Sequence, residues 1–246
     1  MKILAVIPAR YNSQRFPGKP LAMIGDRPMI QWVYEAVKKC GQFYKVIAAT
    51  DNLKIAETVE GFGGDAVITS EKHTTGTDRV AEAALRFEEA DVIANIQGDQ
   101  PFVQLEMLER LISPYLNGEH PDMTTVACPL DMERGYENPN VVKVLCDRNN
   151  NALYFTRAAV PYYRNKSTAP VYQHLGLYAF TREFLLKYSS LDPSPLEVCE
   201  GLEQLRVLEN GYQIRVCIVK NNMIEINTPD DLANAEKLYG LNMFKK

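Results

Sequence analysis

The sequence predicts an α/β fold built on an open, doubly wound and mostly parallel sheet. Short runs of Ile, Val and Ala alternate with helical patterns through the first half of the 246-residue chain. This alternation is typical of parallel sheets that carry helices on their faces. Hydrophobic residues make up 46% of the chain, which is enough for the core of one large domain or of two small ones. From the order of the elements we expect a single domain over residues 1–246, with a smaller mixed α/β elaboration around residues 130–200.

Four short apolar runs in the first half predict buried parallel strands. They are Ile3–Ile7, Lys45–Ala49, Ala66–Ile68 and Val92–Ile96. Between them, apolar residues recur at helical spacing in three segments. These segments are Met29–Lys39, Leu53–Phe62 and Val80–Phe87. Thr77 is expected to cap the third helix, where Asp78 adds negative charge to the first turn.

The regular alternation of short strands and helices ends near residue 104. A helix is expected over Gln104–Ile112, ending before Pro114, because proline disrupts a helix interior. Five strands are expected in the second half, at Thr124–Cys128, Val141–Cys146, Ala152–Phe155, Leu175–Phe180 and Ile214–Val219. Two helices are expected at Thr181–Ser189 and Cys199–Glu209, and a last helix near Thr228.

Composition narrows the function classes. The formal charge of −4 does not indicate a nucleic-acid surface. No apolar run approaches the roughly 18 residues of a membrane span, and no signal-type cleavage site follows the first apolar run. We therefore expect a cytoplasmic protein with no membrane insertion. The five cysteines and three histidines are scattered, which favours free thiols over disulfides or zinc.

Positive charge gathers directly behind the first strand. Arg10, Arg15 and Lys19 lie in the segment Pro8–Leu21, which leaves that strand at its carboxyl end. Ligands of open α/β sheets bind at this edge, and backbone amides with cations suit a polyphosphate. The segment matches neither a Walker A loop nor G-x-G-x-x-G. A solvated surface loop is an equally good interpretation of the charge alone.

Asp99 follows the fourth strand in the stretch Gln97-Gly98-Asp99-Gln100-Pro101. A carboxylate at the same sheet edge as a polyphosphate suits Mg²⁺, which usually takes one or two protein carboxylates and phosphate oxygens. An isolated Asp in a turn is more often a turn former. Together the two features favour nucleotide chemistry.

Several stretches resemble one family of sugar-acid cytidylyltransferases. The opening loop is Ile7-Pro8-Ala9-Arg10-Tyr11 with Phe16-Pro17-Gly18-Lys19-Pro20-Leu21. The more specific stretches are Ala152-Leu153-Tyr154-Phe155-Thr156-Arg157, His174-Leu175-Gly176-Leu177-Tyr178 and Leu202-Glu203-Gln204-Leu205-Arg206. Over nearly the whole chain, the sequence resembles the 3-deoxy-manno-octulosonate (Kdo) cytidylyltransferase family. The resemblance implies a nucleotide-diphospho-sugar transferase-like fold.

The resemblance also implies an activity and a set of site residues. The family transfers CMP from CTP to the anomeric hydroxyl of Kdo for lipopolysaccharide biosynthesis, uses Mg²⁺ and is usually a homodimer. In this chain the implied nucleotide-binding residues are Pro8, Ala9, Arg10, Arg15, Lys19, Gly76, Arg79 and Gln97. The implied sugar-binding residues are Gln97, Arg157, His174, Tyr178, Glu203 and Gln204. Lys19, Arg10 and Asp99 would be catalytic, and the elaboration would contribute the sugar pocket and the dimer contact.

Two positions depart from the family pattern. Asn227 stands where the family usually has a second metal-binding Asp, so Asp99 and Asn227 are the expected metal ligands. Asp231 is expected to cap the last helix together with Thr228. Gln100 stands where the family has Glu, which leaves 8-amino-3,8-dideoxy-manno-octulosonate open as the substrate. Another sugar acid, a sugar 1-phosphate and a regulator without catalysis are further alternatives.

Overall fold

The chain divides into two units that each bury their own apolar residues. Unit 1 comprises Met1–Leu108 and Met223–Lys246, and unit 2 comprises Glu109–Asn222. The computed structural model describes residues 1–12, 16–73, 75–165, 169–223, 225–226 and 228–240. The elaboration expected around residues 130–200 falls inside unit 2. The expectation of a single domain did not indicate this division.

The first-half strands form a parallel sheet in unit 1. They are β1 (Ile3–Ala9), β4 (Phe43–Thr50), β5 (Ala66–Ile68) and β6 (Val92–Asn95). Their order is β6-β1-β4-β5, and every neighbouring pair in this set is parallel. Ile3 to Ile7 are all buried, as the continuous apolar run predicts for a strand covered on both faces. The four predicted strands are confirmed.

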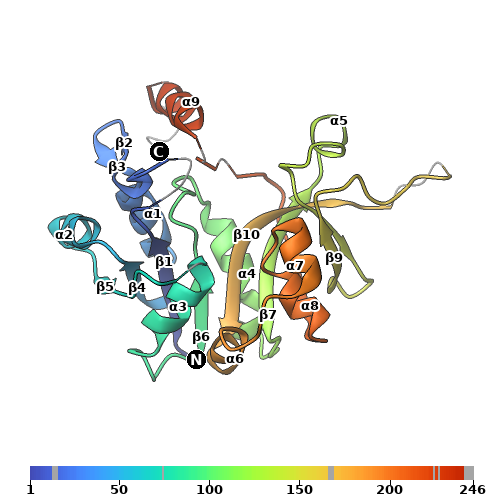
Figure 1. Ribbon diagram of the computed structural model, residues 1–246, viewed down its shortest axis with the longest axis horizontal. Helices are drawn as coiled ribbons and strands as arrows, with labels where there is room; N and C mark the ends of the chain where they lie inside the picture. The colour runs from blue at the N-terminus through green and yellow to red at the C-terminus, as the bar shows by residue number, and fades with distance from the viewer. Residues whose placement is uncertain (13–15, 74, 166–168, 224, 227, 241–246) are drawn as a thin grey trace. The chain divides into compact units, whose positions relative to one another are not determined.

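Helices and short elements connect these strands, and Figure 1 shows them around β1 and β4. The helices are α1 (Met29–Lys38), α2 (Leu53–Gly61) and α3 (Gly76–Ala84). A 3-10 helix, η1 (Lys19–Leu21), and the hairpin β2 (Met23–Ile24) and β3 (Arg27–Pro28) were not predicted. These elements are too short to show a hydrophobic period.

The helix α3 begins earlier than expected. Thr75, not Thr77, is its N-cap, and its hydroxyl accepts a hydrogen bond from the Asp78 backbone N–H at 3.1 Å. Thr77 is buried within the first turn, where its hydroxyl accepts from Asn95 Nδ2 at 3.1 Å. The prediction of a Thr77 cap was wrong because Thr77 is used for tertiary packing.

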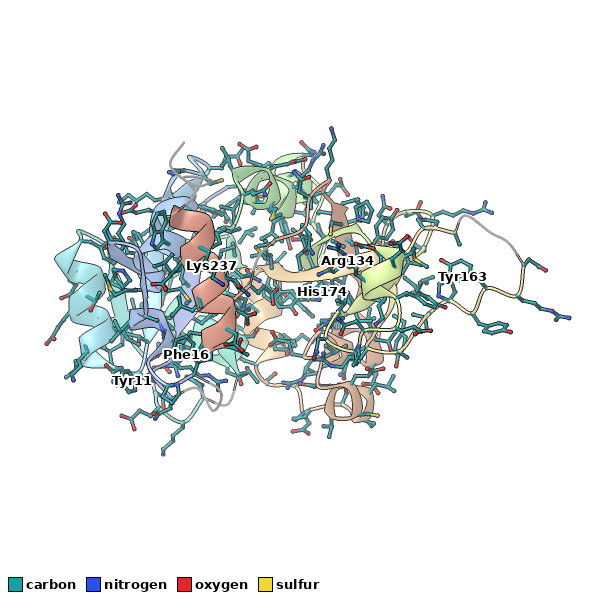
Figure 2. The ribbon with its side chains drawn as sticks, turned by 90° about the horizontal axis from the view of Figure 1, so that it is seen from above. Tyr11, Phe16, Arg134, Tyr163, His174 and Lys237 are labelled. Atoms are coloured by element: carbon teal, nitrogen blue, oxygen red, sulfur yellow. The ribbon has the colours of Figure 1, made fainter. Side chains whose placement is uncertain are left out.

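The chain returns to unit 1 with α9 (Pro229–Gly240), which lies beside the β2–β3 hairpin (Figure 1). The expected cap is confirmed: Thr228 N–H donates to Asp231 Oδ2 at 2.8 Å, and Asp231 N–H donates to Thr228 Oγ1 at 3.2 Å. One apolar cluster joins the helix to the hairpin. Its members are Ile24, Met29, Ile226 and Ala235, with Phe16, Trp32, Phe102 and Leu232 packed against them. Figure 2 shows Phe16 beside α9.

Unit 2 has a mixed sheet. Its strands are β7 (Met123–Pro129), β8 (Lys143–Cys146), β9 (Ala152–Thr156), β10 (Tyr172–Thr181) and β11 (Ile214–Ile218). β10 is antiparallel to β7 and β8, β8 is antiparallel to β9, and β11 is parallel to β7. The helices are α5 (Met132–Gly135), α6 (Arg182–Tyr188), α7 (Pro195–Glu200) and α8 (Leu205–Glu209). The five predicted strands are confirmed.

Two helix predictions were wrong. The helix α4 (Leu105–Leu116) continues through Pro114, because the next residue, Tyr115, is buried and its hydroxyl donates to the Ala179 carbonyl at 3.0 Å. This anchoring offsets the backbone hydrogen bond that proline removes. The expected helix Cys199–Glu209 is divided between α7 and α8, because Gly201 adopts a left-handed φ of 63° and ends α7.

Among the described residues, no helix is long and apolar enough to cross a lipid bilayer. All five cysteines are free thiols, and three of them, Cys40, Cys128 and Cys217, are buried.

Candidate active site

A hydrogen bond joins the two described ends of the cationic segment after β1. Gly18 N–H donates to the Tyr11 carbonyl at 2.9 Å, and Gly18 adopts a left-handed φ of 70° that suits glycine. This turn leads directly into η1 and so places Lys19 back at the end of β1. Arg10 is exposed at the start of the loop, and Arg15 lies outside the described residues.

Lys19 and Asp99 are in direct contact. Lys19 Nζ donates to Asp99 Oδ2 at 2.7 Å and to the Ile226 carbonyl at 3.1 Å. The two side chains keep 15% and 27% of their surface exposed, so both remain reachable. Ile226 N–H in turn donates to the Asp99 carbonyl at 3.0 Å. The cationic loop, the end of β6 and the segment before α9 therefore meet at one point.

Next to this ion pair, the backbone at Gly98 packs closely against the backbone at Pro8. A Cβ on Gly98 would come within 2.8 Å of the Pro8 carbonyl oxygen, so only glycine fits there. A Cβ on Gly76 would lie 3.5 Å from Pro8 Cγ and 3.7 Å from Gln97 Oε1. Pro8, Gly76 and Gln97, which the resemblance assigned to the nucleotide site, therefore lie close together at the carboxyl ends of β1 and β6. Gly98 lies beside them.

Arg79 lies underneath this loop rather than at the surface. Its side chain is 2% exposed, its Nη2 pairs with Asp51 Oδ2 at 2.7 Å, and its Nη1 donates to Thr69 Oγ1 at 2.6 Å. The other oxygen of Asp51 accepts from Tyr11 N–H at 3.2 Å. Asp51 therefore links Arg79 to the start of the cationic loop. Sequence reasoning assigned no role to Asp51, although it directly follows β4 at the same sheet edge.

In unit 2, three predicted sugar-binding residues form one hydrogen-bonded chain. The Thr125 hydroxyl donates to the Leu177 carbonyl at 2.7 Å and lies 2.9 Å from His174 Nε2. That hydroxyl has one proton, so we assign the Nε2 proton to His174. His174 Nδ1 then accepts from Gln204 Nε2 at 3.5 Å, and Gln204 Oε1 accepts from the Tyr178 hydroxyl at 3.1 Å.

His174 is neutral in this chain. Burial lowers the pKa of its imidazole from 6.5 to about 3. The ring also packs edge-on against Phe155, with 5.0 Å between ring centroids. A neutral imidazole can orient Gln204 but cannot supply positive charge to a sugar carboxylate.

Arg157 directly follows β9 and is held from several sides. Its Nε donates to the Glu200 carbonyl at 2.8 Å, and its Nη1 donates to the Pro139 carbonyl at 2.9 Å. These bonds occupy only part of the donor set of a guanidinium. Glu203 lies just before α8, and its carbonyl accepts from the Tyr188 hydroxyl at 3.2 Å. The predicted nucleotide residues thus belong to unit 1, and the predicted sugar residues other than Gln97 belong to unit 2.

Comparison with known proteins identifies the family. A family model described as cytidylyltransferase matches residues 4–216. The 3-deoxy-manno-octulosonate cytidylyltransferase of Acaryochloris marina is 61% identical over 236 residues, which cover 96% of both chains. The chain belongs to the 3-deoxy-manno-octulosonate cytidylyltransferase family. A second member, from Synechococcus elongatus, is 54% identical and covers 96% of this chain and 97% of its own.

One solved structure agrees with this Kdo cytidylyltransferase assignment, and a second shares the fold. A structure of CMP:2-keto-3-deoxy-manno-octonic acid synthetase complexed with CTP has a TM-score of 0.94 and 36% identity, over 98% of this chain and 100% of that one. The 4-diphosphocytidyl-2C-methyl-D-erythritol synthase of Anaerococcus prevotii has a TM-score of 0.63 at 14% identity, which shows a shared fold alone.

The metal-binding expectation for this family member rests on Asp99. Among the described residues, no three His, Cys, Asp or Glu side chains cluster closely enough to hold a metal ion. Asn227, the second expected ligand, lies outside the described residues. A single carboxylate beside a cation still fits the needs of Mg²⁺, which takes the remaining oxygens from phosphates and water.

Proposed function

We propose that this chain transfers the CMP group of CTP to the anomeric hydroxyl of Kdo and releases pyrophosphate. The observation that carries the proposal is the 61% identity to a Kdo cytidylyltransferase over 96% of both chains. The product, CMP-Kdo, would supply lipopolysaccharide biosynthesis.

Lys19 and Arg10 act on the triphosphate in this proposal. Attack on the α-phosphate builds negative charge on its oxygens and on the departing pyrophosphate, and fixed cations stabilise that charge. Lys19 is supported as such a cation because it is anchored by the Ile226 carbonyl and keeps some exposure. Arg15, Pro8, Ala9, Gly76 and Gln97 complete the proposed nucleotide site. Arg79 contributes through Asp51 and the loop.

Asp99 and Asn227 would hold Mg²⁺. When bound, Mg²⁺ would supply Lewis-acid charge to the phosphates. The Lys19–Asp99 contact supports this placement, since it shows a carboxylate within reach of the proposed phosphate-binding cation.

Arg157 binds the sugar carboxylate in this proposal. Its planar guanidinium can hold a carboxylate through two parallel hydrogen bonds. Gln204 and Tyr178 bind sugar hydroxyls, with His174 fixing the Gln204 amide, and Glu203 contributes a further acceptor. The buried chain from Thr125 supports this, because it orients each polar group before the sugar arrives.

Gln100 has an explanation that does not involve the sugar. It is 1% exposed, and its Nε2 donates to Glu225 Oε1 at 3.3 Å. A glutamate at position 100 would place a second carboxylate against Glu225. We therefore favour Kdo over its 8-amino analogue.

A homodimer is part of the proposal. Unit 2 has a surface cavity of about 410 Å³. Its lining includes apolar residues (Leu145, Leu153, Pro161, Pro170 and Tyr172) and polar ones (Asp147, Arg148 and Asn150). Leu153 is 62% exposed and Tyr162 is 88% exposed. Figure 2 shows Tyr163 in an extended segment that leads away from His174. Apolar surface of this kind is typical of subunit contacts. Sedimentation equilibrium should give twice the 27.8 kDa chain mass.

Pyrophosphate release tests the reaction. The purified protein is incubated with Mg²⁺ and each of CTP, UTP, ATP and GTP, in the presence of Kdo, of 8-amino-3,8-dideoxy-manno-octulosonate, or of no sugar. Release with CTP and Kdo together is the expected result. Release only with CTP and the 8-amino sugar would show that the 8-amino sugar, not Kdo, is the substrate. No release with either sugar in ample Mg²⁺ would refute the proposal.

A further inference from the structure

Lys143 is a fully buried lysine in unit 2, at the first position of β8. Its Nζ donates to three carbonyl oxygens, those of Asn138 at 3.0 Å, Val141 at 2.8 Å and Arg157 at 2.7 Å. An ammonium group has three protons, so this geometry satisfies all of them. Burial holds the pKa of Lys143 below its ordinary value, and the nearby Glu200 carboxylate offsets part of this effect. A buried lysine is rare unless its charge is compensated, which indicates a specific use.

The three carbonyls of this cage all belong to the surroundings of Arg157. One is the carbonyl of Arg157 itself. The other two, of Asn138 and Val141, lie within two residues of Pro139, whose carbonyl accepts from Arg157 Nη1 at 2.9 Å. Lys143 therefore holds both the backbone of Arg157 and the short segment that orients its guanidinium.

Glu200 holds Arg157 from the other side. Its Oε2 accepts from the Arg157 backbone N–H at 2.9 Å, and its backbone carbonyl accepts from Arg157 Nε at 2.8 Å. Its Oε1 accepts from the Thr156 hydroxyl at 2.5 Å. Burial works against ionisation of this carboxyl, but these hydrogen bonds hold its pKa below the ordinary value.

We propose that Lys143 and Glu200 are positioning residues that fix the Arg157 guanidinium for the sugar carboxylate. Lys143 does not bind the substrate itself, because its three donors are already used inside the protein. The proposal rests on the proposed function for the role of Arg157. Its structural part, that Lys143 orders residues 138–141 and 156–158, stands without that role.

A double-mutant cycle tests the proposal. Lys143→Met removes the charge and the donors and keeps the length of the side chain, and Arg157→Met removes the proposed carboxylate ligand. Lys143→Met should raise the KM for the sugar acid by about 10- to 100-fold and change the KM for CTP by less than about threefold. In the Arg157→Met background, Lys143→Met should add less than about twofold, because residues that act through one another are not additive. Lys220→Met, which removes an exposed lysine of unit 2, is the matched control and should change neither constant.

Amide hydrogen exchange provides a readout that does not depend on activity. Lys143→Met should speed exchange in residues 138–141 and 156–158 and leave the β7–β11 pair unchanged. Glu200→Gln should likewise speed amide exchange at Arg157. This second variant tests the proposal if the lysine variant does not fold. Fully additive effects on the sugar KM, or unchanged exchange in both segments, would overturn the proposal. If the wild-type protein has no sugar-dependent activity, the proposed function is refuted. The exchange experiment would still test whether Lys143 and Glu200 position Arg157.

Discussion

His174 should couple the stability of this protein to pH. In the folded protein, burial lowers the pKa of its imidazole from 6.5 to about 3. The unfolded chain therefore binds a proton at His174 between these two pH values, while the folded chain does not. Stability falls with decreasing pH wherever the unfolded state binds more protons. The loss begins below pH 6.5 and continues toward pH 3.

The size of this effect follows from the linkage relation. Each pH unit within the window costs about 1.4 kcal/mol. Between pH 7.5 and pH 5.0, His174 should therefore remove about 2 kcal/mol from the free energy of unfolding. The value at pH 5.0 depends almost entirely on the unfolded pKa, because the folded pKa lies well below 5.

Urea unfolding followed by circular dichroism between pH 5.0 and 7.5 measures this loss. His174→Gln should abolish the His174 contribution, so the pH dependence of wild type and variant should differ by about 2 kcal/mol. Any change in the free energy of unfolding that the substitution causes equally at every pH does not affect the difference in pH dependence. His120→Gln, which replaces an exposed histidine of unit 2, is the control and should keep the wild-type dependence. Equal pH dependence in wild type and His174→Gln would refute the reasoning that His174 is neutral and buried.

Two further predictions concern unit 1. Gly98→Ala should lower the free energy of unfolding by about 1–3 kcal/mol and reduce the rate of pyrophosphate release, because its Cβ would meet the Pro8 carbonyl at 2.8 Å beside Asp99. Gly41→Ala, where a Cβ meets nothing within 4 Å, is the matched control for thermal unfolding, and equal effects at both positions would contradict the steric argument. Asn227→Asp should lower the Mg²⁺ concentration that gives half-maximal rate, because it adds a carboxylate to the proposed site. A titration of rate against Mg²⁺ that is the same for both proteins would refute a metal-binding role at this position.

The sequence by itself determined the strands and the candidate residues of unit 1. Buried parallel strands have continuous apolar sequences, so β1, β4, β5 and β6 could be placed from the apolar runs along the chain. The expectation that the cationic segment and Asp99 share one sheet edge followed from topology, since both come after parallel strands. The 2.7 Å contact between Lys19 and Asp99 agrees with it.

Only the tertiary structure decided how those residues are held. Nothing in the local sequence indicates that Arg79 and Lys143 are buried. Both are buried because Asp51 pairs with Arg79 and the Arg157 carbonyl accepts a hydrogen bond from Lys143. Tyr115 carries α4 past Pro114, and Thr125 sets the tautomer of His174 from 49 residues away. Local patterns report propensity and periodicity, whereas the partner of a buried polar group depends on which segments the fold brings together.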